Sequence, residues 1–236
     1  MPPTRQHRRK HFRSTTLLSQ WDGSSAVGIG GTWADKGSAA NNLVLQGNAV
    51  VNSGSGLYVA NIGDYAYKAS ANAQTTDLTV MLWCRIPSGQ IAYQWMDSFL
   101  KVATTKYTWG VLGLNDGGSE KQFEFALGTS EGAAWACVRY SNTFNQGNNA
   151  WLHYAGVYNS APPATCRLWI NGVEHTGGGI TGTPPASLAQ LDHDLYIGGH
   201  PTTLLTHTQD DVRIYNAALT EAQIVAIYNA TVGAHS

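Results

Sequence analysis

Four short stretches in the C-terminal half of the chain decide the fold. They are WLHYAGVYN at residues 151–159, CRLWING at 166–172, LYIGG at 195–199 and DDVRIY at 210–215. In the second stretch, Cys166, Leu168 and Ile170 alternate with Arg167 and Trp169. A period of two is typical of a half-buried strand, because successive side chains of a strand point to opposite faces. We therefore expect a strand here with one face in a core.

A turn follows this strand directly. Asn171 and Gly172 separate it from a second run that begins at Val173. A two-residue hairpin turn needs positive φ at both positions, which Asn tolerates and Gly adopts freely. The sequence therefore predicts a β-hairpin over residues 166–176.

The order and spacing of the four stretches resemble the C-terminal half of a laminin G-like domain. That family belongs to the concanavalin A-like lectin and glucanase jelly rolls. A weaker resemblance continues upstream through GTWADKGSAANNLVLQG, GLYVANIGDYAYKA and LTVMLWCRIP, so that it covers about residues 17–232. The resemblance implies an antiparallel β-sandwich. It does not define a function, because this fold carries lectins, adhesion modules, capsid appendages and enzymes.

The composition fits one all-β domain without a membrane span. The chain has 236 residues, of which 12% are charged and 43% hydrophobic, including 8 Trp and 11 Tyr. Sandwiches of this length are commonly single domains. No run approaches the roughly 20 apolar residues that a spanning helix needs. We expect a soluble protein with a basic N-terminal arm at residues 1–16 and one antiparallel β-sandwich of jelly-roll type at residues 17–236.

A short helix is expected near the C-terminus. Thr220 resembles an N-cap, with Gln223 three residues later in the pattern of a capping box. Ile224, Ile227 and Tyr228 share one helical face, and the helix should stop soon after them. We expect this helix to pack on the edge of the sandwich.

Aromatic side chains that face outward are the candidates for ligand binding. In the strand expected over residues 77–87, the even-numbered positions are apolar and should face the core, whereas the odd-numbered positions, Trp83 among them, should face outward. Trp169 and Tyr215 alternate with apolar neighbours in the same way. Flat aromatic faces stack on the C–H surfaces of sugars, so we expect these three residues to form a glycan-binding surface. A place in the core is the alternative for each of them.

The start of the chain carries a concentrated positive charge. Five of the fourteen basic residues lie in the first thirteen positions, with no acidic residue among them: Arg5, Arg8, Arg9, Lys10 and Arg13. The remainder holds nine basic against fifteen acidic residues, a net charge of about −6, so we do not expect it to bind nucleic acid. We expect the arm to dock on neighbouring subunits of a larger assembly, a capsid or a tail. A solvated disordered tail is the alternative.

Two acidic positions are candidates for a metal. Asp210 and Asp211 could hold a calcium ion together with backbone carbonyl oxygens, as the resemblance implies. Asp22 and Asp35 are candidates as well, but turn-forming roles fit them better, because no dense acidic loop surrounds them.

The three cysteines, Cys84, Cys137 and Cys166, each lie in an expected strand. An odd number does not fit the disulfide framework of a secreted scaffold. We expect buried free thiols, with one bridging pair as the open alternative.

The carboxylates do not form a catalytic pattern. Glucanases of this fold carry their carboxylates at alternate positions of one strand, so that they face one cleft. Asp210 and Asp211 are adjacent and should face opposite sides of a strand, while Asp192 and Asp194 share a face but precede a strand. We therefore do not expect an enzyme.

These features favour a non-enzymatic interaction protein. Our hypothesis is a homo-oligomeric virion subunit that decorates a capsid or tail, is anchored by residues 1–16 and exposes a lectin-like sandwich to cell-surface glycans. The alternatives are a free carbohydrate-binding lectin domain and a polysaccharide-cleaving enzyme. The basic segment is followed only by Leu17 and Leu18 before polar residues, so it lacks the apolar region of roughly 7–15 residues that a secretion signal needs. We therefore expect the chain at a virion surface, or outside the cell after lysis.

Overall fold

The regular secondary structure of the described part of the chain is β-strand except near the C-terminus. The computed structural model describes residues 17–71, 76–87, 95–103, 106–115, 121–128, 135–141, 149–176, 180–188, 193–199 and 206–236. The strands are β1 (Leu17–Trp21), β2 (Thr32–Trp33), β3 (Leu43–Gln46), β4 (Val50–Asn52), β5 (Gly56–Val59), β6 (Tyr65–Ala71), β7 (Leu78–Arg85), β8 (Trp95–Ala103), β9 (Lys106–Asn115), β10 (Lys121–Gly128), β11 (Trp135–Ser141), β12 (Trp151–Asn159), β13 (Thr165–Ile170), β14 (Val173–Glu174), β15 (Ile180–Thr181), β16 (His193–Ile197) and β17 (His207–Tyr215). The helices are α1 (Glu221–Thr231) and the 3-10 helix η2 (Val232–Ala234).

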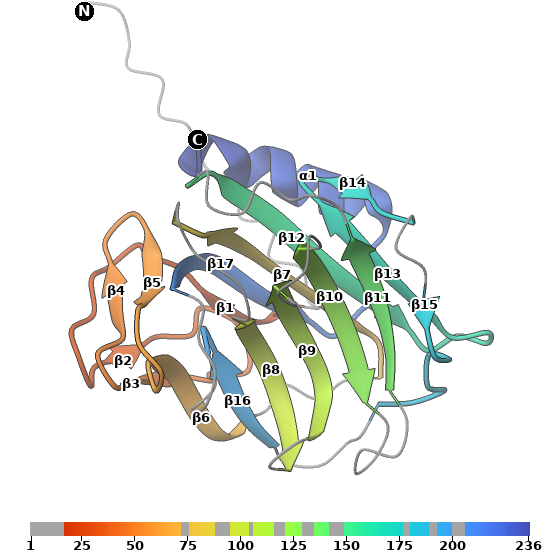
Figure 1. Ribbon diagram of the computed structural model, residues 1–236, viewed down its shortest axis with the longest axis horizontal. Helices are drawn as coiled ribbons and strands as arrows, with labels where there is room; N and C mark the ends of the chain where they lie inside the picture. The colour runs from red at the N-terminus through yellow and green to blue at the C-terminus, as the bar shows by residue number, and fades with distance from the viewer. Residues whose placement is uncertain are drawn as a thin grey trace, which may run out of the picture.

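The strands form two antiparallel sheets that lie face to face (Figure 1). Sheet A has the strand order β14-β13-β12-β7-β17-β5-β4, with β1 also pairing to β17. Sheet B has the order β15-β11-β10-β9-β8-β16-β6-β3-β2. Strands that are distant in the sequence are neighbours: β7 lies between β12 and β17, and β16 lies between β6 and β8. This confirms the predicted antiparallel β-sandwich.

The main core lies between the two sheets. The even-numbered residues of β7 belong to it, as their alternation predicted: Leu78, Val80, Leu82 and Cys84. Phe125 of sheet B is fully buried, and its ring lies directly over Gly156 of sheet A. A Cβ atom at position 156 would come within 2.4 Å of this ring. The close approach of the two sheets at this point therefore depends on glycine.

The hairpin forms as predicted. β13 and β14 pair in antiparallel register, with Asn171 at φ 51° and Gly172 at φ 76° in the turn. Cys166, Leu168 and Ile170 are buried in the main core. The left-handed turn and the alternating strand are thus both set by local sequence.

The C-terminal helix also forms as predicted, but its position differs. Thr220 and Gln223 make the reciprocal hydrogen bonds of a capping box, and Ile224 is fully buried. The helix lies on the outer face of sheet A instead of its edge, in a second apolar cluster with Met81 and Trp169. Among the described residues, no helix combines the length and the apolar character needed to cross a membrane.

A bulge interrupts β17. Asp210 is the register partner of Trp83 and Arg213 that of Met81, so Asp211 is an extra residue in the strand, with φ 46°. The two adjacent aspartates were expected on opposite sides of a strand. This expectation is wrong. The bulge turns Asp211 toward Arg213, so that its side chain lies on the face that carries α1.

Two of the three cysteines are described at the side-chain level. Cys84 and Cys166 are buried thiols, as expected. Burial raises the pKa of Cys84 to about 12, which keeps this thiol protonated and unreactive. The side chain of Cys137 lies outside the described residues.

Candidate functional site

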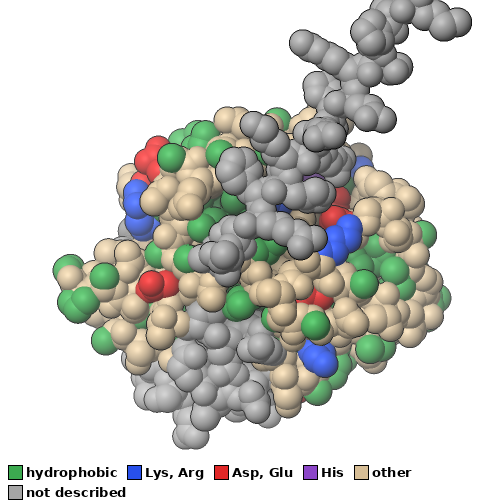
Figure 2. All heavy atoms as spheres, turned by 180° about the vertical axis from the view of Figure 1, so that it is seen from behind, with side chains coloured by type: hydrophobic (Ala, Val, Ile, Leu, Met, Phe, Trp, Pro, Cys, Tyr) green, Lys and Arg blue, Asp and Glu red, His purple; other side chains and the backbone are tan. Residues whose placement is uncertain are grey.

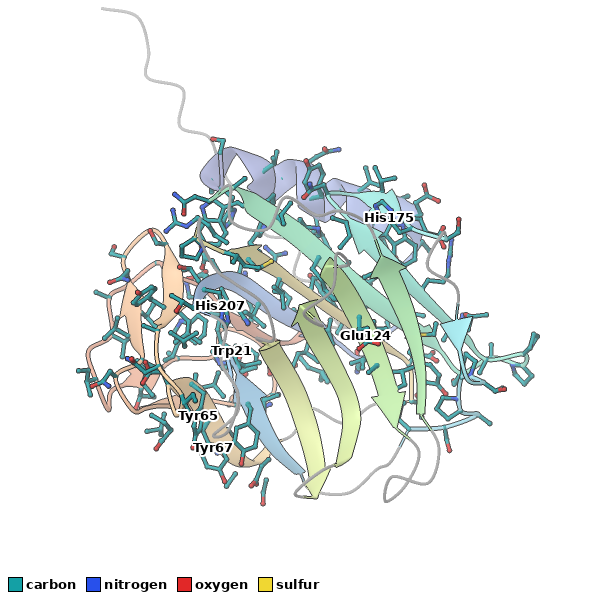
Figure 3. The ribbon with its side chains drawn as sticks, viewed as in Figure 1. Trp21, Tyr65, Tyr67, Glu124, His175 and His207 are labelled. Atoms are coloured by element: carbon teal, nitrogen blue, oxygen red, sulfur yellow. The ribbon has the colours of Figure 1, made fainter. Side chains whose placement is uncertain are left out.

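Three tyrosine side chains gather on the outer face of sheet B. Tyr65 and Tyr67 are two residues apart on β6, and Tyr196 on β16 is the register partner of Tyr67. Ala66, between the first two, points into the main core, so both tyrosines point out of it. Figure 3 shows Tyr65 and Tyr67 next to each other beside β6 and β16. On the other side of β6, Val44 of β3 is the register partner of Tyr67, and it is an exposed apolar residue.

The three rings contact one another at an angle. The ring centroids of Tyr67 and Tyr196 are 5.1 Å apart, and those of Tyr65 and Tyr196 are 5.4 Å apart. Tyr65 and Tyr67 meet edge to face, with centroids 6.4 Å apart and planes inclined by 82°. Aromatic pairs favour such tilted arrangements, which hold the rings in place without a ligand. The surface is therefore preorganised.

One carboxylate lies beside the rings. Asp194 is two residues before Tyr196 on β16, and its Oδ2 accepts a hydrogen bond of 2.9 Å from the Tyr67 hydroxyl. Its Oδ1 accepts a hydrogen bond of 3.2 Å from the Ser70 backbone N–H. Partial burial, and then the hydrogen bond to Asp194, raise the pKa of Tyr67 to about 12, so its hydroxyl stays a donor at neutral pH. We call Tyr65, Tyr67, Tyr196 and Asp194 the tyrosine face.

This arrangement offers two kinds of contact to a ligand. Tyr65 and Tyr67 are partly exposed and present parts of their rings, whereas Tyr196 is only 9% exposed and supports them from within the cluster. The carboxylate of Asp194 presents hydrogen-bond acceptors at their border. A pyranose has the complementary pattern, with C–H groups on its faces and hydroxyl groups around its rim. The tyrosine face is therefore suited to binding a sugar.

The aromatic residues that the sequence suggested lie elsewhere and are covered. Trp83, Trp169 and Tyr215 are on the outer face of sheet A, as predicted, but only 2%, 0% and 4% of their surfaces are exposed. Trp83 stacks on Tyr228 of α1 at 5.7 Å, and its indole N–H donates to Thr231 Oγ1 at 3.0 Å. The expectation that these rings are open to a glycan is corrected, because α1 and η2 cover them. Strand alternation gives the face of a side chain, but it does not show what lies over that face.

The proposed calcium ligands are held by protein groups. Asp210 accepts hydrogen bonds from the Gly23 and Asp211 backbone N–H groups and lies 3.0 Å from His235 Nε2. Asp211 accepts from Gln20 and pairs with Arg213 at 2.6 Å. These contacts give both carboxylates a structural role, and calcium binding by them stays a prediction. In the described ranges, no three His, Cys, Asp or Glu side chains come together as a metal site.

The turn roles predicted for two other aspartates are present. Asp35 accepts hydrogen bonds from the backbone N–H groups of Gln20, Gly37 and Asn41. Asp22 accepts one from the Ser24 backbone N–H and also pairs with a lysine. Both carboxylates fix the loop between β1 and β3.

The basic arm is outside the described part of the chain. Arg5, Arg8, Arg9, Lys10 and Arg13 lie outside the described residues, so the docking role of residues 1–16 stays a prediction. On the side of the molecule seen in Figure 2, the described Lys and Arg side chains stand apart and form no basic patch.

The sequence does carry a signal for the tyrosine face. Tyr65 and Tyr67 flank a single alanine, which puts both on one strand face, and Tyr196 alternates with two apolar residues in LYIGG. What the pattern does not show is that β6 and β16 pair, because more than 120 residues separate them in the chain. The pairing brings the three rings together.

Solved structures show the same fold at low sequence identity. The receptor binding domain of the botulinum neurotoxin C/D mosaic serotype is 13% identical, with a TM-score of 0.71, over 92% of this chain and 52% of that one. The ligand binding domain of botulinum neurotoxin serotype D, in complex with N-acetylneuraminic acid, is 13% identical, with a TM-score of 0.67, over 92% and 51%. The binding domain of Paraclostridial Mosquitocidal Protein 1 is 14% identical, with a TM-score of 0.59, over 91% and 52%. The chain thus spans about half the length of these structures.

Sequence comparison identifies the family. No curated protein sequence matches the chain. A family model described as the concanavalin A-like lectin/glucanases superfamily, of the laminin G type, matches residues 60–225, which include every strand from β6 to β17. By this match and by its sandwich fold, the chain belongs to the concanavalin A-like lectin/glucanases superfamily.

Proposed function

We propose that this chain is a carbohydrate-binding domain without catalytic activity, and that its tyrosine face is the binding surface. The observation that carries the proposal is the contact of three tilted tyrosine rings with one another, beside a carboxylate, on an outer sheet face. Aromatic side chains with a few fixed polar groups at their border are the usual composition of a sugar site.

The comparisons support a binding role in general terms. The similar structures are named as receptor-binding or ligand-binding domains, and one of them holds N-acetylneuraminic acid. Their identity to this chain is 13–14%, so the type of ligand does not transfer from them.

The arrangement of carboxylates favours binding over hydrolysis. A glycosidase needs two carboxyl groups across one cleft, roughly 5–9.5 Å apart. Among the described side chains, Asp194 is the carboxylate of the tyrosine face, whereas Asp210 and Asp211 are on the other sheet and are held by protein donors. Incubation of the protein with polysaccharides should therefore release no reducing ends, and measurable release would favour the enzyme alternative.

A glycan-binding domain acts where glycans are exposed, so the proposal includes a location outside the cell. It favours a lectin domain over a subunit that mainly builds an assembly. Docking on a capsid or tail through residues 1–16 remains a separate prediction, which cross-linking of the arm to a neighbouring subunit would test.

The test is a glycan array with the full chain, followed by titration calorimetry on the sugars that bind. Substitution of Tyr65 by Ala removes one ring of the face and should weaken binding about fivefold, because stacking on one ring contributes on the order of 1 kcal/mol. The matched control is Tyr58→Ala, which removes another partly exposed tyrosine, this one on β5 of sheet A. The control should bind within twofold of the parent chain.

Two results would overturn the proposal. One is an array on which the folded chain binds no carbohydrate. The other is binding that Tyr65→Ala leaves unchanged, which would place the sugar elsewhere.

A further inference from the structure

The end of the chain forms a cover on the outer face of sheet A (Figure 1). We call residues 221–236, which contain α1 and η2, the C-terminal cover. It lies on an aromatic and apolar part of the sheet that includes Met81, Trp83 and Trp169. Of the α1 residues, all of which the structure describes, Ile224 alone is buried. The cover therefore adds little to the main core, which lies on the opposite face of the sheet.

Two side-chain hydrogen bonds join the cover to the described strands. The Trp83 indole N–H donates to Thr231 Oγ1 at 3.0 Å, and His235 Nε2 lies 3.0 Å from Asp210 Oδ2. A terminal helix that is held by few contacts can detach while the rest of the fold stays intact. The cover can therefore open without separating the two sheets.

The chain just before the cover is anchored separately. The Thr79 hydroxyl of β7 donates to the Ala217 carbonyl oxygen at 2.7 Å and accepts from the Leu219 backbone N–H at 3.0 Å. Both partners precede α1, so this anchor does not depend on the helix. Opening therefore begins near Thr220, the N-cap of α1, and leaves β17 in place.

A histidine beneath the cover has an unpaired nitrogen. His153 of β12 lies between Trp83 of β7 and Tyr228 of α1, with ring centroids 5.1 and 5.6 Å away, and is 1% exposed. Within the described ranges, its Nδ1 has no hydrogen-bond partner, and neither has Nε1 of the fully buried Trp169. Opening of the cover gives both nitrogens access to water, which partly offsets the contacts that are lost.

The surroundings of His153 do not favour a positive charge on it. The titratable groups on the elements packed around it are Arg85, Asp210, Asp211, Arg213, Tyr228 and His235. The two carboxylates are already engaged, one with Arg213 and the other with His235. Burial, and then the charges of Arg213 and His235, lower the pKa of His153 from 6.5 to about 3. His153 is thus neutral under the closed cover and accepts a proton more readily once water reaches it.

We propose that the C-terminal cover is an acid-released lid, in which uptake of a proton by His153 favours an open state that exposes Trp83, Trp169 and Tyr215. The lid lies on sheet A and the tyrosine face on sheet B, so the two do not depend on each other. Only the open state binds the proton below pH 6.5, so each further pH unit favours opening about 10-fold. Between pH 7.5 and pH 5, the open population should rise about 30-fold.

Hydrogen–deuterium exchange of the full chain measures the opening, by mass spectrometry of peptides from residues 221–234 at the two pH values. After correction for the intrinsic pH dependence of amide exchange, their protection should be about 30-fold lower at pH 5. Peptides from β7 and β12 should be better protected than the cover at both pH values. Equal protection of the cover and these strands would overturn the lid, because the helix would then leave the sheet only when the whole fold opens.

Replacement of His153 tests its role in the opening. His153→Phe keeps a ring that takes up no proton, so the protection of the cover should change less than about twofold between the two pH values. The matched control, His175→Phe, makes the same change at a partly exposed histidine after β14 and should keep the fall of about 30-fold. If His153→Phe does not fold, His153→Gln, which is also neutral, replaces it. A fall that persists in the neutral variant, or that is absent from the parent chain, overturns the proposal.

Discussion

His235 lies flat against Trp83, with ring centroids 4.4 Å apart and planes only 5° apart. Its Nε2 is 3.0 Å from Asp210 Oδ2 and its Nδ1 is 3.0 Å from the Thr231 carbonyl oxygen. The contact connects the end of the chain to β7 and β17 and holds η2 over the outer face of sheet A.

Replacement of His235 by Ala should lower the free energy of unfolding by about 1–3 kcal/mol. The variant loses the stacked ring and one hydrogen bond to a buried carboxylate. Urea denaturation of the parent chain and the variant measures the difference. Asn229→Ala, at an exposed position of α1, is the control and should change the free energy by less than about 0.5 kcal/mol. An equal loss of unfolding free energy in both variants would mean that the contact between His235 and Trp83 does not stabilise the fold.

His153 should make the protein less stable as the pH falls. It lies between Trp83 and Tyr228, is 1% exposed, and its Nδ1 has no hydrogen-bond partner among the described residues. Burial, and then the charges of Arg213 and His235, lower the pKa of His153 from 6.5 to about 3. Between these values the unfolded chain binds a proton that the folded chain does not, so stability present above pH 6.5 is lost as the pH falls toward 3.

The contribution of His153 to this loss should be about 2 kcal/mol between pH 7 and pH 5. Urea denaturation at the two pH values measures it, with His153→Phe as the comparison because phenylalanine keeps a ring but does not titrate. The variant should lose about 2 kcal/mol less than the parent chain over the same interval. An identical pH dependence in both proteins would show that His153 is protonated without opening the contact with α1.

Replacement of Gly172 by Ala should be unfavourable for two reasons. The residue has φ 76°, and a Cβ atom there would lie 2.9 Å from Tyr228 Cδ1 of α1. We expect a loss of about 1–3 kcal/mol in the free energy of unfolding. Gly233→Ala is the matched control, since a Cβ atom at that position meets nothing within 4 Å. If Gly172→Ala unfolds at the same urea concentration as the control, the turn tolerates a side chain.

The contact between Gly156 and Phe125 gives a prediction about the space between the sheets. Gly156→Ala would place a methyl group 2.4 Å from the Phe125 ring, so the sheets must separate or the ring must move. Thermal denaturation should show a loss of about 1–3 kcal/mol. Gly28→Ala adds the same methyl group where nothing lies within 4 Å, and should leave stability nearly unchanged. Equal melting temperatures for the two variants would argue against tight packing at this point.

The predictions that succeeded concern local patterns. The turn at Asn171 and Gly172 needs left-handed backbone at two positions, and the capping box needs only Thr220 and Gln223, three residues apart. Neither depends on distant parts of the chain. The predicted opening of Trp83 to a ligand failed because the cover comes from α1, whose docking place no local pattern records.

The sequence by itself determined the class of fold, the hairpin, and the helix with its cap. It also determined which side chains of β7 and β13 face the main core. Strand alternation and turn geometry act between near neighbours in the chain, so local sequence is enough to set them. Only the tertiary structure decided that β6 and β16 bring Tyr67 and Tyr196 together, and that α1 closes the outer face of sheet A. Strand pairing and helix docking join segments far apart in the chain. Which strands pair and where the helix docks depend on how well whole faces pack and are buried. Those faces exist only once the sheets have formed.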